Sequence, residues 1–221
     1  MSTTDERSAP TYTLYGGAKN RGLRVLWALE ELGQEAALVD LNLFGGEQRA
    51  EGFLKVNPAG KVPALIDHGA LEGGAPLVVT ESVAILNYLA EKHRDAPTPL
   101  IPEGLRARAA YHQWMSFGAT ELEPPVWVFA KHSFVYSPDK RVEPIKVTSG
   151  FEVLRASRHL AAALADGRPF VLGESFSAAD VFLGQTLLWA ELLGLKRAEG
   201  CDAYVARLLA RPALQRALAR R

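Results

Sequence analysis

The sequence predicts an N-terminal α/β domain followed by an all-α domain, and two observations carry this prediction. Up to residue 92, short apolar or alternating runs stand between segments with helical spacing, which is typical of strands and helices that share one domain. From residue 104 to 221, every clear pattern is helical. The segment 93–103 between them holds three prolines and no periodicity, so we interpret it as a linker.

The first domain, expected over 11–92, has the predicted order β-α-β-α-β-β-α. Residues 1–10 are polar and are predicted to form a flexible tail. The expected elements are a strand at Tyr12–Tyr15, a helix with Val25, Leu26, Leu29 and Leu32 on one face that ends at Gly33, a strand at Ala37–Asn42, a short helix or turn at 47–56, strands at Val62–Asp67 and Leu77–Thr80 joined by a Gly-rich hairpin at 68–76, and a helix at 81–93.

The second domain is expected to be a helical bundle. Its predicted helices cover 103–122, 126–132 after a break at Glu123-Pro124-Pro125, Ile145–Ala165, a segment after Phe176, and two short stretches near the end. Ser177 and Asp180 have the spacing of a capping box, which gives this motif a structural role. The basic segment 206–221 is interpreted as a solvated helix face.

Composition argues against several classes of function. Lys plus Arg and Asp plus Glu both total 25, so no net positive charge draws the chain to nucleic acid or anionic lipid. No segment is long and apolar enough for a signal peptide or a membrane span, so we expect a soluble, cytoplasmic protein. The single cysteine, Cys201, excludes a dithiol site, and the five histidines lack metal-site spacing. The expected partner is a small molecule or another protein.

Val62-Pro63 opens a predicted strand, where proline removes a ladder donor. A cis bond at this step would turn the N–H and C=O of Val62 away from the sheet, where they could pair with an extended peptide. A trans proline that only starts a strand is the alternative.

Glu81 and Ser82 follow a predicted strand and begin a predicted helix. The N–H groups of a helix N-terminus attract a carboxylate, Ser82 adds a hydroxyl, and Glu81 could receive an ammonium group. The structural alternative is that Thr80 or Glu81 caps the helix. Taken together, a backbone clamp beside a paired carboxylate and ammonium site describes a ligand with amino-acid ends and an amide between them.

These motifs resemble a known family. The resemblance lies in NPAGKVPAL (57–65) and ESVAI (81–85), which follow YTLYGGAKNRGLRVLWALEELG (12–33) and resemble the glutathione-binding domain of the cytosolic glutathione transferases. EPPVW (123–127) and FSAADVFLG (176–184) resemble the family's helical C-terminal domain. The resemblance implies a thioredoxin-like first domain, a cis Pro63, and glutathione as a co-substrate with no further cofactor.

The resemblance also implies roles for individual residues. Val62 would pair with the cysteinyl backbone of glutathione, while Glu81 and Ser82 would hold its γ-glutamyl end. Lys61 is similar in position to a basic residue that meets the glycyl carboxylate in some classes, although a solvated surface lysine fits equally well. The family is typically dimeric, so a homodimer is expected.

The thiol of glutathione must ionise to attack an electrophile, and an unperturbed thiol has a pKa of about 8.5. Alignment on Arg24 places Asn20 where the family often has a serine. The Asn20 amide could donate to a thiolate beside a helix N-terminus, and we expect it to be the catalytic residue. Its alternative is a helix N-cap. Tyr15 is a second candidate near the site, with packing as its alternative.

A small hydrophobic electrophile is the second expected substrate. Trp114 and Phe117 lie on a predicted helix of the second domain and are candidates for its pocket, with core packing as the alternative. The first functional hypothesis is glutathione conjugation in detoxification. Reduction of disulfides or peroxides by glutathione at the same site, and a non-catalytic interaction module, are the competing hypotheses.

Overall fold

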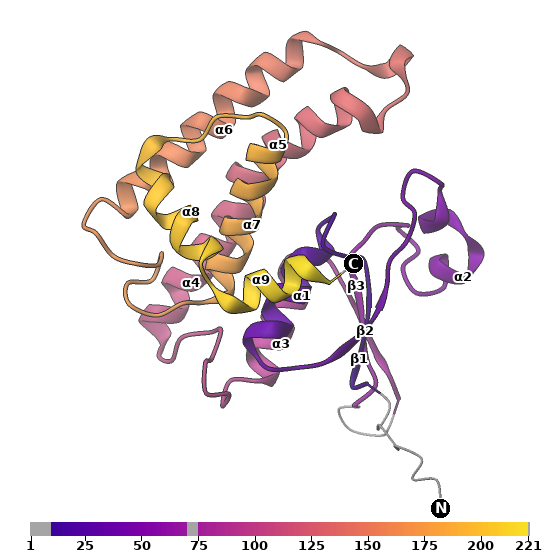
Figure 1. The fold of residues 1–221 in the computed structure, drawn as a ribbon, viewed down its shortest axis with the longest axis horizontal. Helices are drawn as coiled ribbons and strands as arrows, with labels where there is room; N and C mark the ends of the chain where they lie inside the picture. The colour runs from indigo at the N-terminus through magenta and orange to yellow at the C-terminus, as the bar shows by residue number, and fades with distance from the viewer. Residues whose placement is uncertain (1–9, 70–74, 221) are drawn as a thin grey trace, which may run out of the picture.

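The computed structural model describes residues 10–69 and 75–220 (Figure 1). The predicted tail, apart from its last residue, and the predicted hairpin tip at 70–74 lie outside the described residues. The described chain forms a four-stranded mixed sheet with helices in a thioredoxin-like N-terminal domain, followed by a helical C-terminal domain. This confirms the predicted fold class.

The sheet has the strand order β2-β1-β3-β4, with β1 parallel to β2 and antiparallel to β3, and β3 antiparallel to β4. The elements of this domain are β1 (Tyr12–Tyr15), α1 (Gly22–Glu31), β2 (Ala36–Val39), the 3-10 turn η1 (Glu47–Arg49), α2 (Glu51–Leu54), β3 (Ala64–Asp67), β4 (Leu77–Thr80) and α3 (Ser82–Lys92). Strand β3 starts two residues later than expected, which leaves Val62 and Pro63 in the loop before it.

The helical domain consists of α4 (Leu105–Phe117), the π-helical turn η2 (Gly118–Leu122), α5 (Glu123–Ala130), a second π-helical turn η3 (Lys131–Val135), η4 (Pro138–Lys140), α6 (Pro144–Ala163), α7 (Ala178–Leu192), η5 (Glu199–Cys201), α8 (Asp202–Leu209) and α9 (Pro212–Ala219). No helix in 10–69 or 75–220 is long and apolar enough to cross a membrane.

The predicted break at Glu123-Pro124-Pro125 is wrong. The backbone stays helical through Leu122 and Glu123, with φ of −87° and −75°. Both prolines lie in the first turn of α5. The N–H groups of a first turn have no partner within the helix, so the missing N–H of a proline there costs no helical hydrogen bond. The π-helical turn η2 directly before them is the kind of local adjustment that appears inside long helices. Helices α4 and α5 therefore follow one another without a loop.

Helix α1 is the central element of the molecule. Its residues from Gly22 to Leu29 are all buried, including Trp27 at 0% exposure. A helix that is buried all round needs partners on every side, and α1 contacts α3 and β1 in its own domain and α7 and α9 in the helical domain. The two domains therefore share one continuous hydrophobic core.

A buried ion pair joins the two domains at the start of α1. The Arg24 side chain is fully buried; its Nη1 donates to Glu123 Oε2 at 2.9 Å, its Nε to Gln185 Oε1 at 2.7 Å and its Nη2 to Thr186 Oγ1 at 2.9 Å. Arg21 Nε also donates to Glu123. Burial lowers the pKa of Arg24 to about 10, against the opposing attraction of Glu123, so the guanidinium stays charged at neutral pH.

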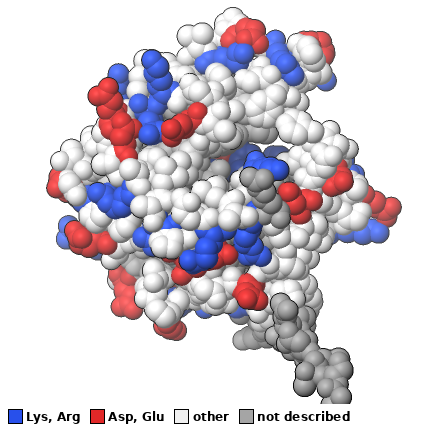
Figure 2. Space-filling view, in the orientation of Figure 1, with Lys and Arg blue, Asp and Glu red and all other residues white. Residues whose placement is uncertain are grey.

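The basic C-terminal segment binds the first domain. Arg211 pairs with Glu31 at 2.6 Å and Arg216 with Glu30 at 2.8 Å, while Arg220 Nη2 donates to the backbone oxygen of Ala36 at 2.7 Å. Figure 2 shows basic side chains gathered near the middle of this face, where α9 lies in Figure 1, with acidic side chains beside them. The expectation of a purely solvated face is therefore wrong, because the acidic partners lie on α1, far away in the sequence.

The predicted capping box of α7 is confirmed. Asp180 Oδ2 accepts from the Ser177 backbone N–H at 2.9 Å, and the Ser177 side chain accepts from the third helical N–H. Asp180 Oδ1 also accepts from Tyr204 Oη at 2.9 Å, which ties α7 to α8. The motif at 176–184 is thus structural, as expected.

Replacing Glu123 by Gln should weaken the joint between the domains. Burial favours the neutral acid, but Arg24 and Arg21 outweigh it and hold the pKa of Glu123 below its ordinary value of 4.5. A carboxylate with a depressed folded-state pKa stabilises the fold above about pH 4.5 and loses this contribution as the pH falls through the folded-state pKa. We expect Glu123→Gln to lower the free energy of unfolding at pH 7 by about 3 kcal/mol, and to show less further loss on acidification.

Urea unfolding at pH 7 and pH 4 measures both effects. Glu191→Gln is the matched control, because Glu191 pairs with Arg197 on the surface and its side chain is 56% exposed. An acid dependence of Glu123→Gln equal to that of the wild type would contradict this account.

Candidate functional site

Three strand ends meet at one edge of the sheet. The register pairs Ala64, the first residue of β3, with Tyr15 at the end of β1 and with Thr80 at the end of β4. Three segments therefore lie at the same edge of the sheet: the one that precedes Ala64, the one that follows Tyr15 and the one that follows Thr80. These segments hold Val62, Asn20 and Ser82, so the sheet brings together three residues predicted from different motifs.

The Val62-Pro63 peptide bond is cis, and Pro63 is buried while Val62 is half-buried. Among the described residues, no hydrogen bond uses the backbone N–H or C=O of Val62. Because a backbone donor and acceptor normally find partners in a folded protein, this pair is available to an extended ligand.

The loop before Val62 is braced by a buried asparagine. Asn57 Nδ2 donates to the Lys61 backbone oxygen at 2.7 Å, and Asn57 Oδ1 accepts from the Ala59 N–H at 3.1 Å. The exposed Lys61 therefore sits on a fixed backbone. Arg49 is close to the same loop, because a Cβ added to Gly60 would lie 2.9 Å from Arg49 Nη1. Among the described residues, neither Arg49 nor Lys61 forms an ion pair.

The N-terminus of α3 offers unpaired polar groups. Glu81 occupies the N-cap position, but its side chain does not cap the helix. The alternative role predicted for Glu81, as a helix cap, is therefore absent. Ser82 is 7% exposed, and within 10–69 and 75–220 no hydrogen bond uses its hydroxyl. Backbone N–H groups at the start of a helix, a free hydroxyl and an outward carboxylate suit a ligand that carries both a carboxylate and an ammonium group.

Glu81 also has a strained backbone, with φ of 68° and ψ of 125°. It is the only non-glycine residue with positive φ among the described residues. Such conformations cost about 1–3 kcal/mol and persist where the surrounding structure enforces them, often at functional sites.

Asn20 lies in the loop between β1 and α1, next to Val62. A Cβ added to Gly16 would be 3.0 Å from Asn20 Oδ1 and 3.4 Å from Val62 Cβ. Asn20 Oδ1 accepts from the N–H of Gly17 at 3.1 Å and of Gly22 at 2.8 Å. The oxygen thus serves the loop and the start of α1, while within the described chain Nδ2 has no hydrogen-bond partner.

The aromatic candidates are engaged in packing contacts, with Tyr15 at the sheet edge and Trp114 and Phe117 on α4. Tyr15 packs on Phe53 of α2, with ring centroids 5.3 Å apart. Trp114 and Phe117 pack on each other and on His159 of α6, at 5.7 and 5.0 Å. Among the described residues, no aromatic contact links Trp114 or Phe117 to the loop around Val62.

Two other aromatic rings face each other across the domains. Phe44, in the loop after β2, lies 6.2 Å from Phe134 of η3, and the two side chains are 88% and 43% exposed. Neither Phe44 nor Arg49 was predicted from the sequence. Phe44 gave a usable signal, since a phenylalanine beside two glycines in a polar loop is an unusual surface residue.

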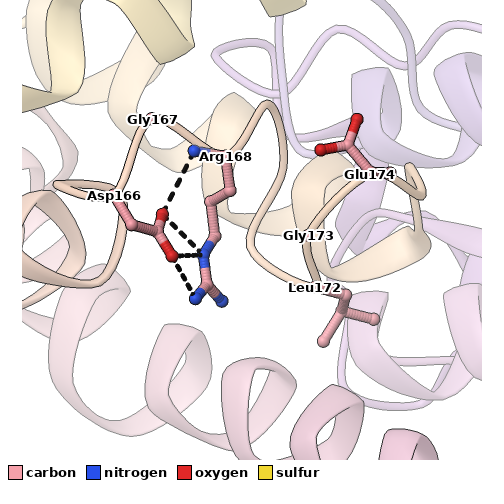
Figure 3. Close-up of a pocket in the computed structure, with 6 residues that line it drawn as sticks. All are labelled: Asp166, Gly167, Arg168, Leu172, Gly173 and Glu174. Atoms are coloured by element: carbon pink, nitrogen blue, oxygen red, sulfur yellow. Dashed lines mark hydrogen bonds and ion pairs between the residues drawn. The ribbon is translucent and has the colours of Figure 1, made fainter.

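A pocket of about 460 Å³ opens in the loop between α6 and α7, on the side of the molecule away from α2 (Figures 1 and 3). In Figure 3 the Asp166 carboxylate turns to the Arg168 guanidinium, and the two groups are 2.6 Å apart. These charges satisfy each other, so this pocket does not compete with the sheet edge as a candidate site. The described residues hold no group of three His, Cys, Asp or Glu side chains that could bind a metal ion.

The fold and the sheet-edge site define a two-domain protein with a thioredoxin-like domain and a helical domain. Residues 10–91 match the model of the glutathione S-transferase N-terminal domain, and residues 152–220 match that of the C-terminal domain. The chain belongs to the glutathione S-transferase family.

Individual proteins are similar over most of the chain. Glutathione S-transferase GstA of Escherichia coli O157:H7 is 31% identical over 86% of this chain and 89% of its own. The disulfide-bond oxidoreductase YfcG of Escherichia coli K12 is 31% identical over 76% of this chain and 75% of its own. A glutathione transferase structure from Burkholderia graminis, with two glutathione molecules bound per subunit, has a TM-score of 0.82 and 25% identity over 97% of this chain and 90% of that chain.

Replacing Glu81 by Gly should stabilise the protein. Glycine adopts positive φ without a steric penalty, so the gain is about 1 kcal/mol after the larger entropy of the unfolded glycine is subtracted. Glu81→Gln keeps the strain and removes only the charge, and we expect its stability to match the wild type. Chemical unfolding of the three proteins tests this, and a Glu81→Gly variant that is less stable than Glu81→Gln would contradict the strain argument.

Proposed function

We propose that this protein is a glutathione transferase that stabilises the thiolate of glutathione for attack on a small hydrophobic electrophile. The observation that supports it most is the meeting of unpaired groups at one sheet edge: the backbone of Val62 after a cis bond, the hydroxyl of Ser82 and the N-terminus of α3. The glutathione-bound relative of similar fold supports the choice of ligand.

In this proposal glutathione binds as an extended peptide. The backbone of Val62, held by Pro63, pairs with the cysteinyl residue. The carboxylate of the γ-glutamyl residue meets Ser82 and the N-terminus of α3, while its ammonium group meets Glu81. Lys61 binds the glycyl carboxylate, and Arg49 shares this task because it lies against Gly60 in the same loop. Opposite charges at the two ends of the site fix the direction of the peptide.

Asn20 is the proposed activating residue. Its oxygen is occupied by two backbone N–H groups, so the free Nδ2 is the group that remains to donate to a thiolate. The N-terminus of α1 adds a partial positive charge. A neutral donor and a helix terminus lower a thiol pKa by stabilising the charged form. The alternative predicted for Asn20, a helix N-cap, is wrong, because Arg21 occupies the N-cap position of α1; Asn20 Oδ1 accepts from the Gly22 N–H one residue beyond it.

Asn20→Ala should raise the pKa of the bound thiol by about one unit, because the loss of one hydrogen bond to a charged group costs on the order of 1.5 kcal/mol. Asn20→Asp should raise it further by placing a negative charge beside the thiolate. The ultraviolet absorbance of the thiolate, followed across a pH series with bound glutathione, measures this pKa. Equal values in all three proteins would remove Asn20 from the mechanism.

The electrophile pocket is proposed where Phe44 and Phe134 face each other, since these apolar side chains are exposed on both sides of the junction between the domains. Tyr15, Trp114 and Phe117 stay sequence-based predictions for an alternative electrophile pocket beside α4. Their contacts with Phe53 and His159 favour packing roles.

Phe134→Ala should raise the KM for an apolar electrophile about tenfold and leave the KM for glutathione unchanged, because a lost aromatic contact costs on the order of 1.5 kcal/mol. Trp114→Ala is the comparison variant and should change neither KM. Steady-state kinetics with a chromogenic aryl halide give both values. The reverse result would return the pocket to the α4 residues of the sequence-based prediction.

Reduction of disulfides by glutathione is the second candidate, because YfcG, a disulfide-bond oxidoreductase, is among the similar proteins. Cys201 is fully buried, and burial raises the pKa of its thiol to about 11, so it does not serve as a nucleophile. Two glutathione molecules would supply both thiols and leave as glutathione disulfide while the substrate disulfide becomes two thiols. Product analysis separates this reaction from conjugation, and failure to bind glutathione would instead favour a non-catalytic interaction module.

A further inference from the structure

Arg21 follows the proposed activating residue and is held by the other domain. Its Nε donates to Glu123 of α5. Its guanidinium carbon lies 4.5 Å from the ring centre of Trp127 and 4.7 Å from that of Trp189, on α5 and α7. The two indole rings are 6.1 Å apart and inclined at 41°. One planar cation therefore contacts a carboxylate and two aromatic faces at once.

The loop that Arg21 belongs to is bonded to its own sheet, where the Gly16 N–H donates to the Val39 oxygen of β2 at 3.0 Å. It contacts the helical domain through Arg21 and, one helical turn on, Arg24. Gly16, Gly17 and Gly22 let the segment between β1 and α1 turn tightly, since a Cβ added to Gly22 would lie 2.4 Å from the Gly17 nitrogen. Its internal bonds run from Asn20 Oδ1 to Gly17 and Gly22, and from the Asn20 N–H to the Gly17 oxygen at 3.2 Å. These bonds fix the shape of the loop, and Arg21 adds a contact with the helical domain directly beside Asn20. Figure 1 shows this loop at the junction of the two domains.

The charge of Arg21 is not free to act on a neighbouring thiolate. Glu123 neutralises it, and the Arg21 side chain is only 24% exposed. The contact with Glu123 and the two indole rings holds Arg21 in a fixed position. The planar guanidinium of an arginine both binds a carboxylate and stacks on aromatic rings, which the ammonium group of a lysine does not do.

We propose that Arg21 is a positioning residue for thiol activation: clamped by Glu123, Trp127 and Trp189, it holds the Asn20 amide at the place where the glutathione sulfur binds. This inference rests on the proposed function. It links the helical domain to chemistry that occurs in the first domain, so a change on α5 or α7 alters the reactivity of the thiol without touching glutathione.

The test uses Arg21→Lys, Arg21→Gln and Trp127→Leu, with Arg216→Lys as the matched control. Arg216 is also an arginine between the domains, paired with Glu30 far from the loop. Two quantities are measured in the full-length protein: the dissociation constant of glutathione, and the pKa of the bound thiol from its ultraviolet absorbance. Thermal unfolding checks that each variant is folded.

We expect Arg21→Lys and Arg21→Gln to raise the pKa of the bound thiol by the same amount, roughly 0.5–1 unit, although Arg21→Lys keeps the charge. Both variants should lower turnover on the order of tenfold, because small displacements of a catalytic group have such effects. Trp127→Leu should act in the same direction without any change of charge. The dissociation constant of glutathione should change less than about twofold in all variants, and Arg216→Lys should behave as the wild type.

Other outcomes overturn the inference. A normal thiol pKa in Arg21→Lys with a raised one in Arg21→Gln would mean that the charge acts, not the position. Equal effects of Arg216→Lys would mean that any contact between the domains matters, and unchanged values in all variants would remove Arg21 from activation. If the wild type binds no glutathione, both the proposed function and this inference fail. If the wild type binds glutathione with a lowered thiol pKa and the variants have the same pKa, only this inference fails. Should Arg21→Lys fail to fold, Trp127→Leu decides between the same outcomes.

Discussion

The buried contact between Arg24 and Glu123 constrains the rest of the molecule. A fully buried guanidinium is tolerated only when its donors are satisfied, and here Glu123, Gln185 and Thr186 from the helical domain do so. The first domain therefore cannot turn relative to the second without leaving a charge unpaired. Helix α1 is fixed by this contact, and its first turn carries the loop with Asn20.

The candidate site differs from other polar clusters by what is left unsatisfied. Asp67 is also buried beside the sheet, but it accepts hydrogen bonds from Tyr88, Lys92 and the Gly69 N–H. Val62 and Ser82 have no such partners among the described residues. A folded chain leaves few polar groups unused in a partly buried place, so these two mark the edge where a ligand completes the hydrogen bonding.

Local patterns decided much of what the sequence predicted correctly. Alternating apolar residues and a glycine stop define β1 and α1, and the spacing of Ser177 and Asp180 defines the start of α7. The break expected at Pro124 and Pro125 is absent because the preceding turn is π-helical and leads directly into α5. No pattern of residue types in the sequence indicates a π-helical turn. The basic C-terminus was misjudged because its acidic partners lie on α1.

The sequence by itself determined the fold class and singled out Asn20, Val62 and Ser82 as candidates, because turns, helix starts and a proline before a strand are short-range features. Only the tertiary structure decided that Asn20 uses its oxygen on the loop, that Arg49 lies against Gly60, and that Arg21 is enclosed by residues of two distant helices. These arrangements depend on how non-neighbouring elements pack. A short motif contains no information on which side chain from the other domain will arrive beside it.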